Sequence, residues 1–454
     1  MDIARILGAE APAGNGAFGR RVSRVATDSR TVEEGDLFVA LPGARFDGHN
    51  FVVQAAARDA AAAVVARPIA TDIPQILVPD TAEALRGLAR ARRREFAGPV
   101  VAVTGSCGKT TTKDFITEVL GMKYRVRSSV GNLNNEYGVP LSVLALDDED
   151  EVLVVELGVS APGDMALIAA VAMPTVAVIT SIAPTHLEFF GDVAAVRREK
   201  GALLKYVKEG GSTILNADDP LVVSMVHELV NGLHWVTYGF SEEAQVRPSA
   251  YESLGLPGSR FRLPGGTTVE LRVPGSYNVS NALAAAAVGG LLGIPEDEIA
   301  VGLASYRGRP LRGQVIAGPR GAVFFVDCYN SSPEAAKAAL ALVGGVPARR
   351  RIAILGDMLE LGVASEVAHR GVGRFAFERG FDVLAALGAG GRDILFGALA
   401  AGMPPERALA FDTPEELAVF VKEAVEDGDV VLVKASRGVH LEEVLAAAGV
   451  LPAA

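Results

Sequence analysis

One segment of the chain combines the residue types that bind a phosphate group. A β-branched run, Val100–Thr104, leads into a short glycine turn, and Lys109 and Thr110 follow at the start of an expected helix. Glycines let backbone N–H groups converge on an anion at a helix N-terminus, lysine adds positive charge, and a threonine hydroxyl can bind Mg²⁺. The sequence therefore predicts a nucleoside triphosphate site made by Gly105, Ser106, Cys107, Gly108, Lys109, Thr110 and Thr111.

The segment departs from the usual phosphate loop at one position. That loop has a glycine five residues before its second glycine, whereas Val103 stands there in this chain. A Gly-Lys-Thr sequence in an ordinary loop is the alternative, but a strand before it and a helix after it favour nucleotide binding. We expect the helix over Thr110–Leu120, with Gly121 as a left-handed terminator and an apolar face made by Phe115, Ile116, Val119 and Leu120.

Two residues further along could complete a metal or phosphate site, and a third is a charged residue without such a signal. Glu156 ends an apolar run and so stands at the carboxyl edge of the expected sheet, where ligands bind; an ordinary strand-end carboxylate is the alternative. His186 lies in the loop after the expected strand Val176–Thr180, and the local residues fit a structural histidine as well as a metal or phosphate contact. Lys200 stands among charged residues and by itself predicts a solvated helix lysine.

Length and composition limit the kinds of protein that this chain can be. Its 454 residues are too many for one ordinary core and suggest about three domains. Half of the residues are apolar, and the net charge of −11, with only short basic runs, argues against a nucleic-acid partner. The chain has no uninterrupted apolar run of membrane-spanning length, and Met1–Arg5 lacks the apolar core of a signal peptide, so we expect a cytoplasmic protein without membrane insertion. Cys107 and Cys328 cannot form a disulfide framework, and we expect both to pack rather than act as nucleophiles.

The alternation of apolar runs and helical patterns predicts an α/β fold of three domains. Residues 1–98 form the first domain, rich in small apolar residues, and end in a basic helix, Ala82–Phe96. Residues 99–312 form a central domain with a doubly wound, mostly parallel sheet, followed by a β-rich stretch, Val246–Val273, and a helix, Asn278–Leu292. Its strands are expected at Val100–Thr104, Val152–Glu156, Val176–Thr180 and Ser212–Leu215.

Residues 313–454 restart the alternation and predict a Rossmann-like C-terminal domain. Strands are expected near Val323–Val326, Ile352–Leu355, Val383–Ala386 and Val430–Val433, between helices such as Pro333–Leu342 and Pro414–Val425. No Gly-x-Gly-x-x-Gly follows its first strand, so we do not expect a dinucleotide site.

Other distinctive segments stand in a fixed order along nearly the whole chain: Thr27–Thr31, Phe46–His49, Gly131–Pro140, Leu215–Pro220, Val273–Asn278, Asp327–Asn330 and Leu355–Gly362. Together with the phosphate loop, they resemble the Mur ligase family, the ATP-dependent amide-bond-forming enzymes of peptidoglycan synthesis. Gly131–Pro140 and Leu355–Gly362 resemble most closely the type that joins D-alanyl-D-alanine to a UDP-N-acetylmuramoyl tripeptide.

The resemblance implies roles that the residues alone leave open. It makes Thr110, Glu156 and His186 ligands of two Mg²⁺ ions, and it implies that Lys200 can be carbamylated by CO₂, which gives a hard cation an oxygen ligand. It places Asn281 and Asp327 against the adenine and ribose of ATP and Arg309 against the phosphates. It assigns the uridine nucleotide to Ser29, Arg30, Asp47 and His49, and the peptide substrate to Asn134 and Asn135, for which side-chain-capped turns are the alternative.

The implied reaction needs no covalent enzyme intermediate, which agrees with the lack of a recognisable Ser-His-Asp or Cys-His arrangement. The tripeptide carboxylate attacks the γ-phosphate, and the dipeptide amine displaces phosphate from the acyl phosphate. The catalytic residues would be Lys109, His186, Lys200 and Arg309, and the chain is expected to work as a monomer. Another ligase of the family, a folylpolyglutamate synthetase or a P-loop switch are the alternatives. Departures from the family pattern at Gly158–Gly163, Tyr329–Pro333 and Lys434–Arg437 are small loop substitutions, which bear on substrate detail more than on the reaction.

Overall fold

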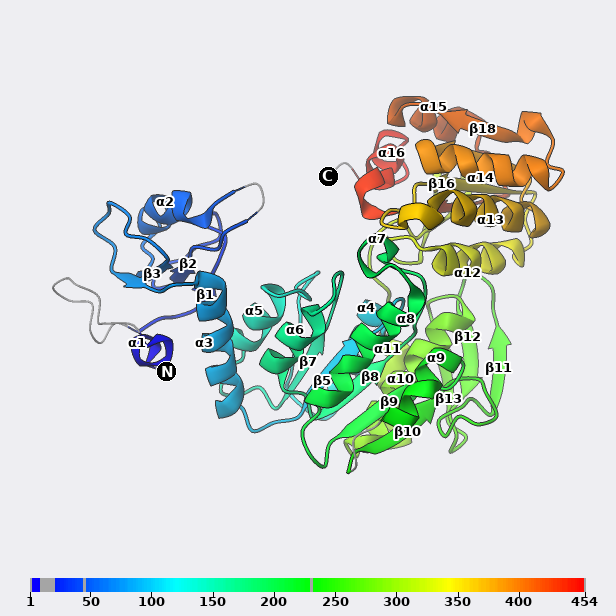
Figure 1. Ribbon diagram of the computed structural model, residues 1–454. Coiled ribbons are helices and arrows are strands. Elements are labelled where there is room, and N and C mark those ends of the chain that lie inside the picture. The colour runs from blue at the N-terminus through cyan, green and yellow to red at the C-terminus, as the bar shows by residue number, and fades with distance from the viewer. Residues whose placement is uncertain (1, 9–20, 44–45, 229–231, 453–454) are drawn as a thin grey trace.

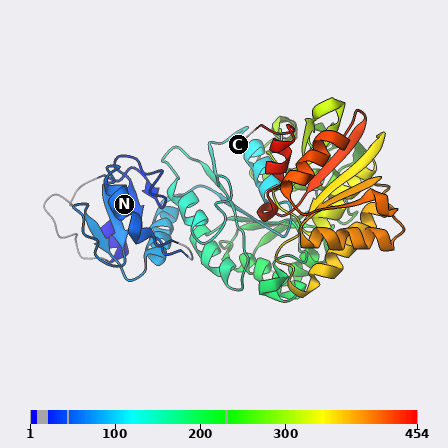
Figure 2. The ribbon, with the colours of Figure 1, turned by 90° about the horizontal axis from the view of Figure 1, so that it is seen from above.

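The computed structural model describes residues 2–8, 21–43, 46–228 and 232–452, so Met1 of the N-terminal segment lies outside them. The described chain forms three α/β units in a row, with the central unit between the N-terminal and C-terminal ones (Figure 1). Seen from above, the N-terminal unit stands apart, while the C-terminal unit lies over the central one (Figure 2). This arrangement confirms the predicted α/β class, and the exact domain boundaries stay a prediction.

The N-terminal unit is built on a small parallel sheet in the order β1-β2-β3-β4. Its longest helix, α3, begins after Asp80, whose carboxylate accepts hydrogen bonds from the N–H groups of Ala82 and Glu83. The predicted basic helix is confirmed, and it buries Leu85 and Leu88 on one side. The elements are α1 (Ile3–Leu7), β1 (Val25–Ala26), β2 (Leu37–Val39), η1 (Gly48–Phe51), α2 (Val52–Ala56), β3 (Ala62–Val65), β4 (Gln75–Leu77) and α3 (Thr81–Glu95).

The central unit has a six-stranded parallel sheet in the order β10-β9-β8-β5-β7-β6. Its strands are nearly continuous buried apolar runs because helices cover both faces. The first elements are β5 (Val100–Thr104), α4 (Lys109–Leu120), β6 (Val126–Ser128), α5 (Gly138–Leu144), β7 (Val152–Glu156), α6 (Asp164–Ala172), β8 (Val176–Ile179), α7 (Leu187–Phe190) and α8 (Val193–Gly201). The next are η2 (Ala202–Tyr206), β9 (Ser212–Asn216), α9 (Pro220–Val223), η3 (Ser224–Glu228) and β10 (His234–Tyr238).

A small antiparallel sheet follows, β11 (Ala250–Ser253), β12 (Ser259–Arg262) and β13 (Thr268–Leu271), where the sequence predicted a β-rich stretch. Helices α10 (Ser276–Leu291) and α11 (Glu296–Ser305) then return to the large sheet. They pack with α4 over one face, in the same core as β5, β7 and β8, whereas α5, α6 and α8 cover the other face. The predicted doubly wound arrangement is therefore confirmed.

The C-terminal unit carries a second six-stranded sheet in the order β14-β15-β19-β16-β17-β18, parallel except for the edge strand β14. Helices cover both of its faces, as in a Rossmann-like fold. Its first elements are β14 (Gln314–Ala317), η4 (Pro319–Gly321), β15 (Val323–Val326), α12 (Pro333–Gly344), β16 (Arg350–Gly356), η5 (Gly362–Ala364) and α13 (Ser365–Glu378). The rest are β17 (Val383–Leu387), α14 (Ala389–Ala400), η6 (Pro405–Arg407), β18 (Ala408–Phe411), α15 (Pro414–Ala424), β19 (Asp429–Lys434), η7 (Arg437–Val439) and α16 (Leu441–Ala447).

One local prediction is wrong. Gly121 follows α4 as expected, but its φ of −61° is right-handed rather than left-handed. The chain continues past it in a helical turn, in which Met122 N–H donates to the Val119 carbonyl and Tyr124 N–H to the Leu120 carbonyl. The predicted apolar face of α4 is confirmed, because Phe115, Ile116, Val119 and Leu120 are fully buried. None of the helices in the described residues has the length and apolar character needed to span a bilayer.

Candidate active site

The phosphate loop, Gly105–Thr111, joins the inner strand β5 to α4 at the carboxyl edge of the large sheet. Its glycines adopt backbone conformations that other residues rarely take, with φ of 148° at Gly105 and 84° at Gly108. A Cβ atom at Gly105 would lie 1.9 Å from Thr180 Oγ1, and one at Gly108 would lie 2.5 Å from Asn281 Oδ1. Both positions require glycine, and the loop opens a helix N-terminus as an anion site does.

Lys109 begins α4 and folds back over this loop. Its Nζ donates a hydrogen bond to the Gly105 carbonyl at 2.8 Å. Burial lowers the pKa of the ammonium group; nearby Glu156 opposes this shift, and the positive charge of Arg312 adds to it. The Lys109 ammonium group is therefore close enough to Glu156 and Arg312 for both charges to act on its pKa.

Glu156 ends β7 beside the phosphate loop, as predicted. Thr110 Oγ1 donates to Glu156 Oε2 at 2.7 Å, and Asn134 Nδ2 donates to Oε1 at 2.9 Å. The carboxylate is buried, and its residue pairs with Val103 of β5 in the sheet register. A hydroxyl and a carboxylate oxygen at this spacing form the donor set that Mg²⁺ prefers, so these residues fit the ion.

The two asparagines predicted to face a peptide substrate have local partners in the structure. Asn134 supports Glu156, and its carbonyl accepts from Gly158 N–H at 2.8 Å. Asn135 Oδ1 accepts from the N–H of Gly138 at 2.9 Å, at the start of α5. Asn135 thus makes the capped turn that the sequence left open as its alternative.

Lys200 is buried in α8, with 1% of its surface exposed, so the local prediction of a solvated lysine is wrong. Burial lowers the pKa of its ammonium group well below the usual range, and the nearby positive charge of Lys109 lowers it further. A lowered pKa means that more of the lysine is the neutral amine, and the neutral amine is the nucleophilic form that reacts with CO₂. The residue therefore fits the carbamylation that the family resemblance implies.

His186 lies after β8, which pairs with β5 as expected. Its φ of 54° is left-handed, and it forms the cap of the short helix α7. Burial lowers the pKa of the imidazole, Glu360 opposes the shift, and the charges of Lys200 and Lys109 lower the pKa further. The charges of Lys200 and of Lys109 in the phosphate loop therefore both act on the His186 imidazole.

The residues expected to contact adenosine flank the same sheet edge. Asn281 is buried in α10, where its Oδ1 accepts from Thr112 Oγ1 of α4 at 3.1 Å. Asp327 follows β15 of the C-terminal unit and pairs with Lys434 Nζ at 2.6 Å. Burial raises the pKa of the Tyr277 phenol, and Asp327 contributes, so this carboxylate lies near the first turn of α10.

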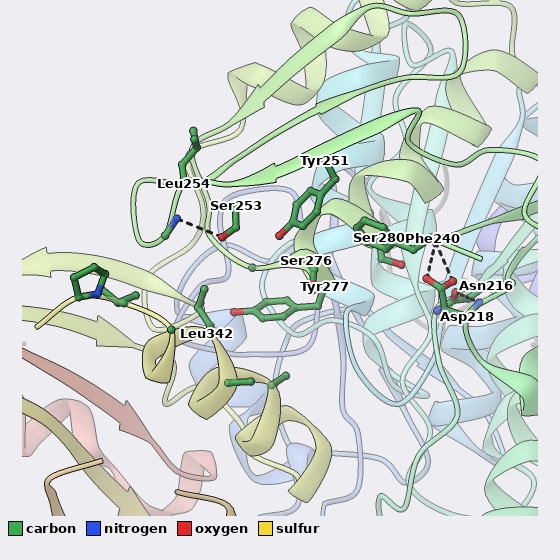
Figure 3. A pocket seen from close by; sticks show the side chains of 17 residues that line it. Asn216, Asp218, Phe240, Tyr251, Ser253, Leu254, Ser276, Tyr277, Ser280 and Leu342 are labelled. Carbon is green, nitrogen blue, oxygen red and sulfur yellow. Dashed lines mark hydrogen bonds between the residues drawn. The ribbon is translucent and has the colours of Figure 1, made fainter. Parts of the chain in front are cut away.

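A cavity of about 830 Å³ adjoins that turn. It lies between the hairpin that begins at β11, the start of α10 and helix α12 of the C-terminal unit, and Figure 3 shows Tyr251 and Tyr277 on facing sides of it. Ser280, next to Asn281 in the chain, also lines the cavity. An aromatic-lined cavity at the start of α10 is large enough for a nucleobase and ribose.

Family models match the chain in three stretches that correspond to the three units. They are the Mur ligase family catalytic domain over residues 21–93, the Mur ligase middle domain over residues 103–289 and the Mur ligase glutamate ligase domain over residues 311–437. A UDP-N-acetylmuramoyl-tripeptide--D-alanyl-D-alanine ligase of Bacillus subtilis (strain 168) is 36% identical over 426 residues, covering 93% of this chain and 92% of the relative. The chain belongs to the Mur ligase family.

Solved structures of this Mur ligase family agree with the sequence comparison. A crystal structure of MurF from Acinetobacter baumannii aligns with a TM-score of 0.88 and 31% identity, covering 98% of this chain and 97% of that one. MurF ligase from Thermotoga maritima, solved in complex with ADP, aligns with a TM-score of 0.83 and 32% identity over 95% of this chain and 97% of that one. The chain therefore has the three-domain Mur ligase fold, and membership in a ligase family argues against the P-loop switch.

In this Mur ligase, two arginines that stand three positions apart in the sequence have different contacts in the structure. Asp114 of α4 binds the guanidinium of Arg309 through both carboxylate oxygens, and this pairing raises the pKa of Arg309. Arg312 stacks over the Tyr329 ring at 3.9 Å, has no carboxylate partner among the described residues, and influences Lys109 electrostatically. The sequence predicts a phosphate contact for Arg309, which stays a prediction, and gives no signal for Arg312, although both stand in the Gly308–Gly313 segment.

The residues predicted to bind uridine gather at the carboxyl edge of the N-terminal sheet. Ser29 and Arg30 follow β1, whereas Asp47 and His49 follow β2. Ser29 Oγ donates to Gln54 Oε1 at 2.7 Å, and the exposed Arg30 pairs with Asp28. Asp47 accepts from the backbone N–H of His49 at 3.0 Å, and His49 Nε2 accepts from an N–H just after β3 at 2.8 Å. Strand ends thus bring these residues to one edge, where ligands bind in such sheets.

Proposed function

We propose that this Mur ligase joins D-alanyl-D-alanine to a UDP-N-acetylmuramoyl tripeptide at the expense of ATP. The observation that carries the proposal is the length of the match: relatives named for this activity align over nine-tenths of the chain, across all three units. The segments Gly131–Pro140 and Leu355–Gly362, which resemble this type most closely, lie within that alignment. No feature of the described residues specifically favours the activity of another Mur-type ligase or of a folylpolyglutamate-type ligase.

ATP would occupy the phosphate loop, with its base in the cavity beside α10 and contacts to Asn281 and Asp327. Thr110 and Glu156 would hold one Mg²⁺ ion, and His186 and a carbamylated Lys200 would hold a second. Bound Mg²⁺ neutralises phosphate charge, which makes phosphoryl transfer to an anion possible. The Thr110–Glu156 contact and the buried amine of Lys200 support these assignments.

The substrate carboxylate would attack the γ-phosphate to give an acyl phosphate and ADP. Two anions must approach each other, so cations of the chain supply a main part of the catalysis. We assign this task to Lys109 and Arg312, because Lys109 Nζ contacts the phosphate loop and Arg312 stacks on Tyr329, whereas the Arg309 guanidinium is bound by Asp114. The amine of the dipeptide then attacks the acyl carbon, forms the amide and releases phosphate.

The three units would divide the substrates among them. Residues 1–98, with Ser29, Arg30, Asp47 and His49, would hold the uridine nucleotide. Residues 99–312 would bind ATP, with Asn134 and Asn135 near the tripeptide, and residues 313–454 would receive the dipeptide. Enclosure between the units would keep water from the acyl phosphate. We infer that the enzyme works as a monomer in the cytoplasm, where ATP is made.

A phosphate-release assay tests the proposal. The enzyme would receive ATP, Mg²⁺ and the UDP-N-acetylmuramoyl tripeptide, with or without D-alanyl-D-alanine. We expect phosphate release that depends on the dipeptide and a product whose mass equals that of the joined substrates. Release that ignores the dipeptide, or follows glutamate instead, would reject the proposed substrate pair.

A further inference from the structure

The C-terminal unit contacts the candidate metal site of the central unit through Glu360. Oε2 of Glu360, in the loop after β16, lies 2.5 Å from Nδ1 of His186. The backbones dock as well, because Glu188 N–H donates to the Glu360 carbonyl at 3.3 Å. A Cβ atom at Gly362 would lie 3.3 Å from Glu188 Cα, so a side chain at that position would crowd the contact.

The loop that presents Glu360 is tied firmly to its own unit. Met358 N–H donates to His369 Nε2 at 2.8 Å, and Leu359 N–H donates to Ser436 Oγ at 3.0 Å. Asp357 Oδ1 accepts from Gly391 N–H at 3.0 Å. These hydrogen bonds fix the backbone just before Glu360, so the position of its carboxylate relative to the C-terminal unit is well defined.

Both ends of this contact have unusual backbones. His186 has a φ of 54° and Glu360 a φ of 63°, a left-handed conformation that costs about 1 kcal/mol or more for residues other than glycine. A pair at the surface contributes too little to explain that cost at both ends. Such strain concentrates at functional sites, where the surrounding structure maintains it.

We propose that Glu360 is a positioning residue that sets the imidazole of His186 for metal binding from across the gap between the units. A proton on Nδ1 faces the carboxylate and leaves the lone pair on Nε2, and such carboxylate–histidine pairs fix the tautomer and ring orientation of metal ligands. Nδ1 lies within hydrogen-bond distance of the carboxylate but the contact is poorly directed, so a rotation of either side chain would complete the pair. The proposal rests on the metal role of His186 in the proposed function.

The pairing has a thermodynamic consequence. If Glu360 supports the metal ligand only when the units are close, metal binding favours the close arrangement, and the close arrangement favours metal binding by the same factor. The second metal half-site would then be complete only when the dipeptide-binding unit is in place. Phosphoryl transfer would then depend on the position of the unit that receives the dipeptide.

The test measures Mn²⁺ affinity of the ADP-bound enzyme by electron paramagnetic resonance, without turnover. We expect His186→Ala and Glu360→Ala each to weaken binding by about tenfold or more, as for other residues that support metal ligands. The double variant should be little weaker than either single one, since the two residues act as a unit. Glu360→Gln keeps an acceptor oxygen and should restore much of the affinity.

Glu378→Ala is the matched control, because Glu378 is an exposed glutamate at the end of α13 in the same unit. It should leave Mn²⁺ affinity unchanged, and thermal unfolding of every variant checks the fold. If His186→Ala weakens binding and Glu360→Ala does not, the role of Glu360 is overturned while the metal site stands. If neither variant weakens binding, the metal role assigned to His186 is itself wrong. Fully additive losses would show independent residues and would also overturn the pairing.

Discussion

The two arginines of the Gly308–Gly313 segment offer a sharp contrast for mutagenesis. Arg312 stacks on Tyr329 near Lys109, whereas Arg309 is held by both oxygens of the buried Asp114. We therefore expect Arg312→Ala to lower turnover and to leave stability nearly unchanged. Arg309→Ala should mainly lower stability.

The magnitudes follow from these environments. Loss of one preorganised electrostatic group at a reacting centre costs about 100-fold to 1,000-fold in kcat. Removing Arg309 leaves the Asp114 carboxylate with Lys113, whose Nζ lies 3.2 Å away, so the loss stays near the cost of one broken charged hydrogen-bond pair. That cost is about 1 to 3 kcal/mol of unfolding free energy.

Steady-state phosphate release and urea unfolding measure the two effects on the same preparations. Arg312→Lys is the matched control, because lysine keeps the charge but loses the planar stacking on Tyr329. It should recover part of the turnover. Full activity of Arg312→Ala, together with a 100-fold loss in Arg309→Ala at unchanged stability, would refute the assignment and return the role to Arg309.

Three other changes test separate parts of the site. Thr110→Val removes the hydroxyl that binds Glu156 and should raise the Mg²⁺ concentration needed for half-maximal rate by about tenfold. An unchanged Mg²⁺ titration would contradict the role of Thr110 as a ligand. Val103→Gly creates the glycine of the usual loop but empties a fully buried strand position, so urea unfolding should show a loss of about 2 to 4 kcal/mol and no gain in activity. Cys328 is buried, and burial raises the pKa of its thiol to about 12. A maleimide at pH 8 should therefore label Cys107 in the native enzyme and leave Cys328 unlabelled. Mass mapping of the labelled cysteine checks this.

Much of the central unit could be predicted from the sequence because its signals are local. Apolar runs bounded by turns mark buried parallel strands, and β5 and β7 begin and end where predicted. The glycines of the phosphate loop are required by backbone geometry that a short segment defines. Glu156 was found for the same reason, since a strand's last residue lies at the carboxyl edge of the sheet.

The parts that were missed depend on distant residues. Lys200 sits among charged neighbours in the sequence, and only the packing of α8 against the sheet buries it. The distinction between Arg309 and Arg312 comes from Asp114, far earlier in the chain. The conformation of Gly121 depends on the turn that follows it. Glu360 lies in the distinctive Leu355–Gly362 segment, but its contact with His186 had no local signal because that residue belongs to another unit.

In the proposed mechanism this chain activates a carboxylate by phosphorylating it. A tripeptide whose terminal carboxylate carries ¹⁸O tests that claim directly, in a reaction with ATP and D-alanyl-D-alanine. We expect one labelled oxygen to leave with the phosphate, because the carboxylate oxygen bonded to phosphorus departs when the amine attacks the acyl carbon. Mass spectrometry of the released phosphate measures this transfer. Amide formation with unlabelled phosphate would contradict the acyl-phosphate route, and the absence of any labelled amide product would contradict the ligase activity itself.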